Sequence, residues 1–149
     1  MYSKVLVPLD GSSNAEVVLP HVEMLAQAFD SEVILFRAIP HPQGVTDEMG
    51  RQIITVDAAI DSAMSEAHSY LQEVAARLKN KGVKSIRHQV EIGNPAELII
   101  DFANGSGVRI IAMATHGRSG ISRWVYGSVA ERVLRHATVP VLLVRVQGQ

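Results

Sequence analysis

The sequence predicts a doubly wound α/β domain, that is, a parallel sheet with helices on both faces. Short segments rich in valine, isoleucine and leucine alternate with longer segments of helical character along the whole chain. Neighbouring strand segments are separated by helical segments, and no hairpin signal joins two of them. Because crossovers between parallel strands are right-handed, this alternation produces a sheet sandwiched between helices.

Five segments carry the strand signal. Each is short, apolar and bounded by glycine, proline, asparagine or aspartate. Four have near-continuous apolar runs, typical of strands covered on both faces, whereas the third alternates and is expected nearer an edge. The segments are Lys4–Leu9, Glu32–Ile39, Ile86–Ile92, Val108–Ala114 and Val139–Val146.

Three helical segments begin with N-terminal capping patterns. Two match the capping box, in which a serine side chain and a glutamate three residues later bond backbone N–H groups reciprocally. The third has an asparagine cap, a proline in the first helical position and a glutamate in the first turn. The starts are Ser13 with Glu16, Asn94 with Pro95 and Glu97, and Ser128 with Glu131.

The first helical segment and the long middle segment have further markers. Pro20 lies inside the first helix pattern, so a kink or a break is expected there. A helical stripe of apolar and small residues runs from about Asp57 to Lys81 and ends at Gly82. The preceding segment, His41–Gly50, has loop chemistry and the length of a mobile lid or a crossover.

Composition restricts the class of protein. The 149 residues are enough for one domain that buries a core without disulfides or metals, so we expect a single domain over residues 1–149. No segment approaches the roughly 18–20 apolar residues of a membrane span, and the start lacks the features of a signal peptide. With no cysteine, a cytoplasmic protein is expected. A net charge of -1 provides no field that would attract nucleic acid.

The segment ATHGRSGISRWVYGSVAERVLR is suited to holding an anion. Glycine allows close approach of the backbone, and free N–H groups at a helix N-terminus favour negative charge, so phosphate is the natural ligand. Gly117 is followed, after nine residues, by Gly127 and Ser128 at a helix start. The Ser128 hydroxyl and the Arg118 guanidinium, with Arg123 near, can add hydrogen bonds.

Asp10 follows the first strand, in a loop expected to neighbour that segment. In doubly wound sheets, ligands bind beyond the carboxyl ends of the strands, where the strand order reverses. The Asp10 carboxylate can accept hydrogen bonds from a ribose or help to place Mg²⁺.

Each of these residues also has a purely structural interpretation. Ser128 can simply cap its helix, His116 can be a loop histidine without a catalytic partner, and Asp10 can start a turn with Gly11. Arg118 and Arg123 can be surface charges, and Trp124 can anchor the loop.

Familiar catalytic and metal-binding motifs are missing from the sequence. It contains neither the P-loop pattern nor the G-x-S-x-G elbow, and Gly105-Ser106-Gly107 lacks the third glycine of a dinucleotide fingerprint. The six histidines show no metal-ligand spacing. We therefore assign no catalytic residue.

Taken together, these motifs resemble the universal stress protein family over nearly the whole chain. The resemblance rests on KVLVPLDGSSNAE, GNPAELIIDFA, VRIIAMATHGRSG and GSVAERVLRHATVPVLLVR. It implies a Rossmann-like fold of the adenine nucleotide alpha hydrolase type, with a five-stranded parallel sheet of order 3-2-1-4-5, and a homodimer. One branch of the family binds ATP through the pattern G-x2-G-x9-G-[ST].

This chain has Ala114 at the first glycine of that pattern. The resemblance implies ATP or another adenine nucleotide as ligand, accompanied by Mg or Mn with Asp10 as metal ligand. Alanine is harmless there if the position has β geometry, which we expect, and unfavourable if it needs a left-handed conformation. The implied nucleotide-binding residues are Pro8, Asp10, Ala38, Met113, Ala114, His116, Gly117, Arg118, Gly127, Ser128 and Val129.

The resemblance also implies a homodimer through the last strand. An edge strand over Val139–Val146 would leave backbone groups and apolar side chains unpaired unless a second subunit covered them.

The sequence therefore predicts a nucleotide-binding regulatory protein, with a stress response implied by the family alone. Nothing in the loop plainly activates water, so at most slow ATP hydrolysis is expected, with His116 the nearest base. Two alternatives stay open. One is a dimeric interaction module of the same fold that binds no nucleotide, and the other is a hydrolase or nucleotidyl transferase.

Overall fold

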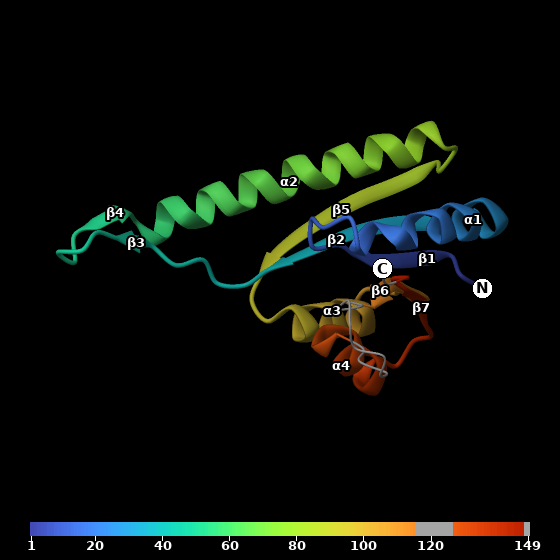
Figure 1. Cartoon of the computed structure of the whole chain (residues 1–149). Helices are drawn as coiled ribbons and strands as arrows, with labels where there is room; N and C mark the ends of the chain where they lie inside the picture. Colours follow the sequence, from blue (N-terminus) through green and yellow to red (C-terminus); the bar gives the residue numbers. More distant parts are fainter. Residues whose placement is uncertain (116–126, 148–149) are drawn as a thin grey trace.

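A computed structural model describes residues 1–115 and 127–147 of the chain. Five parallel strands form one sheet in the order β5-β2-β1-β6-β7 (Figure 1). This is the predicted order 3-2-1-4-5 when only the predicted strands are counted, and the doubly wound fold is confirmed. The strands are β1 Lys4–Pro8, β2 Glu32–Ile39, β5 Ser85–Ile92, β6 Ile110–Thr115 and β7 Val141–Arg145.

Helices cover both faces of the sheet. The first two α-helices lie on one face and the last two on the other (Figure 1). The short 3-10 helix η1 lies on the same face as the first two α-helices. The helices are η1 Ala15–Val18, α1 Leu19–Phe29, α2 Val56–Asn80, α3 Pro95–Gly105 and α4 Ser128–His136.

Strand alternation divides the core into two layers. In β1, Val5 and Val7 belong to the cluster under α1 and α2, whereas Leu6 belongs to the cluster under α3 and α4. In β2, Leu35 and Phe36 divide in the same way, and all of these side chains are fully buried. The central strands are apolar on both faces because both faces are covered.

The alternating third strand lies at an edge of the sheet, as predicted. All eight residues of β5 pair with β2, from Ser85 with Glu32 to Ile92 with Ile39. Along β5, only Val90 is buried, which agrees with the mixture of apolar and polar residues in its sequence.

The first helical segment is interrupted next to Pro20, and its predicted capping box does not form. The 3-10 helix η1 ends at Val18 and α1 begins at Leu19, so Pro20 occupies the first turn of α1, where a missing N–H costs no hydrogen bond. The Ser13–Glu16 capping box does not form, since the N-cap of η1 is Asn14 and the Glu16 carboxylate bonds to Tyr70 and Arg77. Ser12 accepts a hydrogen bond from the Ala15 N–H at 3.2 Å instead.

The other two predicted helix starts have different outcomes. Asn94 caps α3 as predicted, and its side chain accepts a hydrogen bond from the Glu97 N–H at 3.1 Å. The capping box predicted from Ser128 and Glu131 does not form. Gly127 is the N-cap of α4 and Ser128 the first helical residue, while Glu131 pairs with Arg135 at 3.0 Å.

The expected loop before α2 contains a β-hairpin that the sequence did not predict. Strands β3 (Val45–Thr46) and β4 (Gln52–Ile54) pair antiparallel, and Figure 1 shows them projecting beyond the sheet with the start of α2. The Asp47 side chain organises the turn, accepting hydrogen bonds from the N–H groups of Met49 and Arg51. We call residues 45–56 the arm.

None of the helices in the described part of the chain combines the length and the apolar character that crossing a bilayer requires.

Candidate functional site

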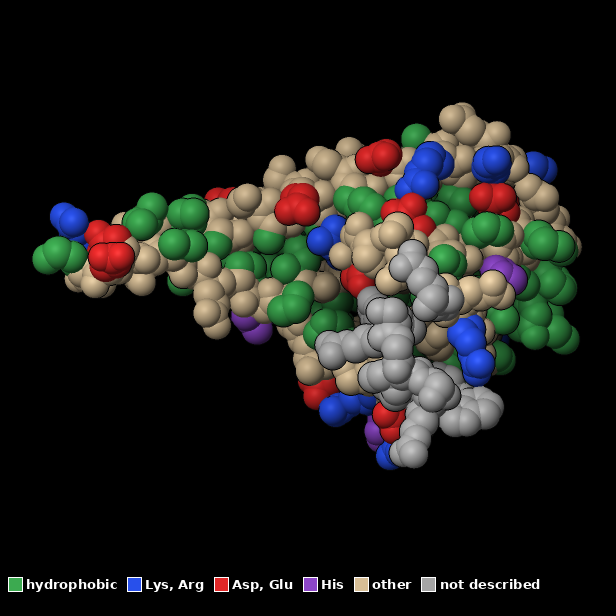
Figure 2. Space-filling view, viewed as in Figure 1, with side chains coloured by type: hydrophobic (Ala, Val, Ile, Leu, Met, Phe, Trp, Pro, Cys, Tyr) green, Lys and Arg blue, Asp and Glu red, His purple; other side chains and the backbone are tan. Residues whose placement is uncertain are grey.

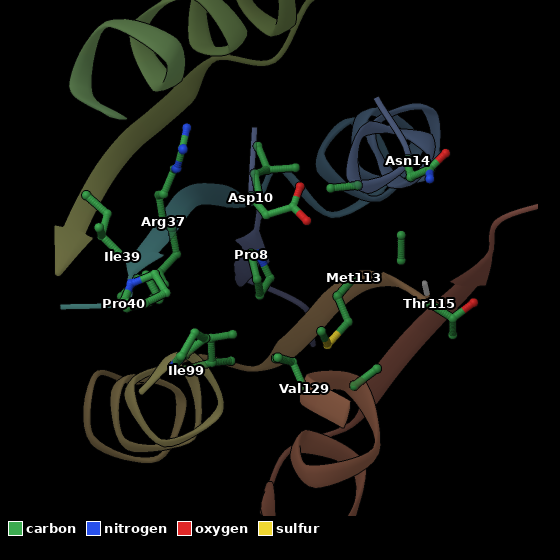
Figure 3. Close-up of a pocket in the computed structure, with 17 residues that line it drawn as sticks. Pro8, Asp10, Asn14, Arg37, Ile39, Pro40, Ile99, Met113, Thr115 and Val129 are labelled. Atoms are coloured by element: carbon green, nitrogen blue, oxygen red, sulfur yellow. The ribbon is translucent and has the colours of Figure 1, made fainter. Parts of the chain in front are cut away.

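A cavity of about 250 Å³ opens at the carboxyl edge of the sheet, between the ends of β1, β2 and β6 and the first turns of α3 and α4 (Figure 3). Most of its wall is apolar. The apolar side chains are Pro8, Leu9, Ala15, Phe36, Ala38, Ile39, Pro40, Pro95, Ile99, Met113, Ala114, Val129 and Ala130. The polar ones are Asp10, Asn14, Arg37 and Thr115.

Most of the predicted site residues that the structure describes meet at this cavity. Gly127 and Ser128 do not line it themselves, but they begin the helix whose next two residues do. Pro8, Asp10, Ala38, Met113, Ala114 and Val129 line the cavity. His116, Gly117 and Arg118, with Arg123 and Trp124, lie outside the described residues.

Ala114 has the β geometry that we expected. It belongs to β6 and pairs with Val144 of β7. Among the described residues, Asp30 is the one non-glycine residue with positive φ, so Ala114 is not left-handed. Its methyl group therefore adds no backbone strain at the position where the family pattern has glycine.

Asp10 both starts a turn and lines the cavity, so its two interpretations are compatible. Its Oδ1 accepts hydrogen bonds from the Ser12 N–H at 2.9 Å and from the Ser12 hydroxyl at 2.5 Å. Gly11, between them, has φ +88°, a conformation that glycine adopts at little cost. The turn fixes the direction of the carboxylate at the cavity edge (Figure 3).

The first turn of α4 presents backbone donors on the opposite side of the cavity. Gly127 has extended backbone angles (φ −51°, ψ 149°), and no side chain among the described residues caps the helix. The positive end of the helix dipole lies at this terminus, beside the lining residues Val129 and Ala130. This part of the site suits an anionic group.

Sequence reasoning missed Arg37. It is half-buried near the end of β2, lines the cavity, and places its guanidinium 5.4 Å from the centre of the Tyr70 ring. A single arginine in the strand EVILFRAI has no local pattern that distinguishes it from a surface charge. Its stacking partner lies on α2, far along the chain.

A polar cluster supports Arg37 from the side of α2. The Glu16 carboxylate accepts hydrogen bonds from the Tyr70 hydroxyl and from Arg77, both at 2.7 Å. Burial raises the pKa of Glu16, but the hydrogen bonds from Arg77 and Tyr70 outweigh it, and the net pKa lies below the usual value. Burial and the bond to Glu16 raise the pKa of Tyr70, which keeps its hydroxyl protonated.

The described residues contain no cluster of three or more histidine, cysteine, aspartate or glutamate side chains able to hold a metal ion. Of the described residues that line the cavity, Asp10 alone carries a carboxylate. A metal ion at this edge would thus need most of its ligands from a bound molecule and from water.

Comparison with known proteins gives a consistent result. The model of the universal stress protein family matches residues 1–145. Universal stress protein MJ0531 of Methanocaldococcus jannaschii is 31% identical over 147 residues, which cover 97% of this chain and 83% of the relative. Universal stress protein MJ0577 of the same organism is 30% identical, with 97% and 96% covered.

Solved structures agree with the fold. The structure of MJ0577 superposes with a TM-score of 0.80 at 29% identity and covers 100% of this chain and 99% of its own. A universal stress protein in complex with cAMP has a TM-score of 0.71 at 20% identity, with 98% of both chains covered. The Archaeoglobus fulgidus protein in complex with dAMP has a TM-score of 0.66 at 20% identity, with 95% and 97% covered. The chain belongs to the universal stress protein family.

Proposed function

We propose that the protein is a regulatory module of the stress response that binds ATP in the cavity at the carboxyl edge of the sheet. One observation carries the proposal. An apolar cavity wall adjoins both an oriented carboxylate, Asp10, and the uncapped first turn of α4. A purine base, a ribose and a chain of phosphates need this sequence of environments.

The apolar part of the cavity suits the base. Pro8, Ile99 and Met113 come from separate elements and converge on the same space (Figure 3). Ala38 of β2 also lines this space. A volume of about 250 Å³ takes a base with part of its sugar, so phosphates would extend outward along α4. Such pockets characteristically combine apolar walls with a few polar groups.

The phosphates would lie against the start of α4. Gly127 and Ser128 supply backbone N–H groups and a hydroxyl at the positive end of the helix dipole. His116, Gly117 and Arg118 belong to the same proposal through the family pattern, although they lie outside the described residues. Val129 would close the cavity beneath the sugar.

The divalent ion, Mg²⁺ or Mn²⁺, would arrive with the nucleotide. Magnesium in nucleotide sites commonly takes one or two carboxylates together with phosphate oxygens. Asp10 offers one carboxylate, which fits this limited role. The described lining contains no histidine, cysteine or lysine, and we propose at most slow ATP hydrolysis.

The ligands of fold relatives support an adenine nucleotide. Two universal stress proteins of this fold were solved with cAMP and with dAMP. Because these relatives are only 20% identical, their ligands support an adenine nucleotide in general and do not indicate how many phosphates it carries. Calorimetry would rank the affinities of the protein for ATP, AMP and cAMP.

The test is calorimetry of ATP with and without Mg²⁺ on the wild type, Ala114→Gly and Gly127→Val. Gly127→Val places a branched side chain at the start of α4 and should abolish binding. Gly105→Ala is the matched control, because a Cβ there meets nothing within 4 Å. Binding that survives Gly127→Val would contradict the phosphate site.

We also propose a cytoplasmic homodimer that pairs through β7. In β7, Val141, Leu142, Leu143 and Val144 are only half-buried, although the strand is apolar and forms an edge of the sheet. Pairing with a second copy would satisfy the edge. The absence of cysteine favours a reducing compartment. Light scattering at micromolar concentration tests the dimer, and a monomer would refute it.

The alternative is an interaction module of the same fold that binds no nucleotide. Exposed apolar side chains in the arm favour it, with Met49 80% and Ile53 65% exposed. Figure 2 shows hydrophobic side chains on the surface of this projecting end of the molecule. In this alternative, ATP would fail to bind even after Ala114→Gly, whereas binding restored by that change would show that the lost glycine matters.

A further inference from the structure

Arg37 lies where β2 meets the rim of the cavity. Its neighbours Phe36 and Ala38 pack into the cluster under α3 and α4, so strand alternation turns Arg37 toward α2 on the other face. In Figure 3, its aliphatic stem follows the cavity wall and its guanidinium rises to the rim, on the same side as the Asp10 turn. The Arg37 side chain is therefore partly buried at the rim of the cavity.

Two contacts hold the guanidinium in place. It stacks over the Tyr70 ring at 5.4 Å, and the Tyr70 hydroxyl is fixed in turn by its bond to Glu16. It also lies close to Gly11, where an added Cβ would come within 2.8 Å of the Arg37 Nη1 atom. The cation is therefore oriented before any ligand binds.

Arg37 has no anionic partner among the described residues. It makes no hydrogen bond or ion pair with them, whereas five other arginines each pair with a carboxylate. The nearby Glu16 carboxylate accepts its hydrogen bonds from Tyr70 and Arg77, and not from Arg37. Those five are Arg51, Arg77, Arg87, Arg132 and Arg135.

The sheet order places Arg37 opposite the proposed phosphate site. Strand β1 lies between β2 and β6, so the loop that carries Asp10 lies between the ends of those strands. Arg37 is near the end of β2, and Thr115 ends β6 on the side of α4. If a ribose bonds to Asp10 through one hydroxyl and carries its 5′-phosphates at α4, its other hydroxyl would face the side of the cavity where Arg37 lies.

We propose that Arg37 is a specificity-determining residue that binds a phosphate on the 2′ or 3′ position of the ribose. The cavity then prefers adenine nucleotides carrying such a phosphate over those phosphorylated only at the 5′ position. A guanidinium matches phosphate with two parallel hydrogen bonds, and arginines beside the ribose recognise 2′-phosphates in dinucleotide-binding folds. This inference rests on the proposed nucleotide site.

The experiment compares adenosine 3′,5′-bisphosphate with adenosine 5′-monophosphate by calorimetry, on wild type, Arg37→Met and Arg109→Met. The wild type should bind the bisphosphate about tenfold more tightly, in line with a charge-assisted hydrogen bond. Arg37→Met keeps the aliphatic stem and should bring this affinity ratio close to one. Arg109 is exposed and precedes β6, so Arg109→Met should leave the ratio unchanged.

The outcomes separate this inference from the proposed function. A ratio near one in the wild type, or an unchanged ratio in Arg37→Met, overturns the role of Arg37 while the nucleotide site stands. If Arg37 only supports the fold, both affinities fall in parallel and the ratio is preserved. Absence of binding by both nucleotides overturns the proposed function and, with it, this inference.

Discussion

The Tyr70 hydroxyl on α2 donates a hydrogen bond to the Glu16 carboxylate on η1 at 2.7 Å, across 54 residues of sequence. This contact joins the long helix α2 to the short helix η1. Since Arg37 stacks on the same tyrosine, the contact also supports Arg37 at the rim of the cavity.

Replacing Glu16 by glutamine should destabilise the protein by about 1 kcal/mol at neutral pH, because the charge that Arg77 and Tyr70 bind is lost. The folded-state pKa of Glu16 is lowered, so its contribution is present above the unfolded pKa. The contribution disappears as the pH falls through the folded pKa. Urea denaturation of wild type and Glu16→Gln between neutral and acidic pH measures the difference.

Glu66→Gln is the control for that series. Glu66 is exposed on α2, and the structure gives it no hydrogen bond or ion pair with the described residues. Its substitution should leave the pH dependence unchanged. A constant difference between wild type and Glu16→Gln at every pH would contradict the assignment.

His68 on α2 and His88 on β5 share a hydrogen bond of 3.2 Å between Nδ1 and Nε2. One ring must donate and the other accept, so the bond requires at least one neutral ring. A double-mutant cycle with His68→Leu and His88→Leu should give a coupling of about 1 kcal/mol in the free energy of unfolding. Urea denaturation of the wild type, the two single variants and the double variant measures this coupling, and a value near zero would show that the bond contributes nothing to stability.

Gly11→Ala should cost more stability than the same change at Gly82. Both glycines have positive φ, +88° and +99°, so both changes add strain of about 1–2 kcal/mol. At Gly11 the new Cβ would also approach the Arg37 Nη1 atom to 2.8 Å, whereas at Gly82 the nearest atom is 3.5 Å away. Thermal denaturation of the two variants measures the excess. Equal losses of stability in the two variants would mean that the Arg37 side chain moves aside without cost.

Asn94→Ala should destabilise the protein by about 1 kcal/mol, since it removes the side-chain cap of α3. Asn80→Ala, at the exposed end of α2, is the matched control and should change stability by less than about 0.5 kcal/mol. Chemical denaturation compares the two, and similar losses would contradict the importance of the cap.

Local sequence signals predicted the features that local contacts determine. The cap of α3 was predicted correctly because Asn94 and its partner Glu97 are three residues apart. The edge position of β5 followed from its alternation. The capping box at Ser13 failed because Glu16 finds Tyr70 and Arg77, 54 and 61 residues away, partners that no local pattern reveals.

Some residues of the candidate site could likewise be predicted from the sequence, and others could not. Pro8, Asp10 and Met113 were found because they lie at or near the carboxyl ends of β1 and β6, within motifs that resemble the family. Arg37 was missed, since its importance depends on Tyr70 and Gly11, which only the folded chain brings near it. The hairpin was missed because strands of two and three residues are too short to show a period.

The arm is a place where residues can be inserted into the chain. Its turn is organised from within, because Asp47 bonds to Met49 and Arg51 and the pairing of β3 with β4 is separate from the main sheet. Gly50, at the tip, has no atom within 4 Å of where a Cβ would be. The tip is therefore a permissive site, where a fluorescent reporter or an affinity tag can be inserted without breaking a hydrogen bond of the five-stranded sheet.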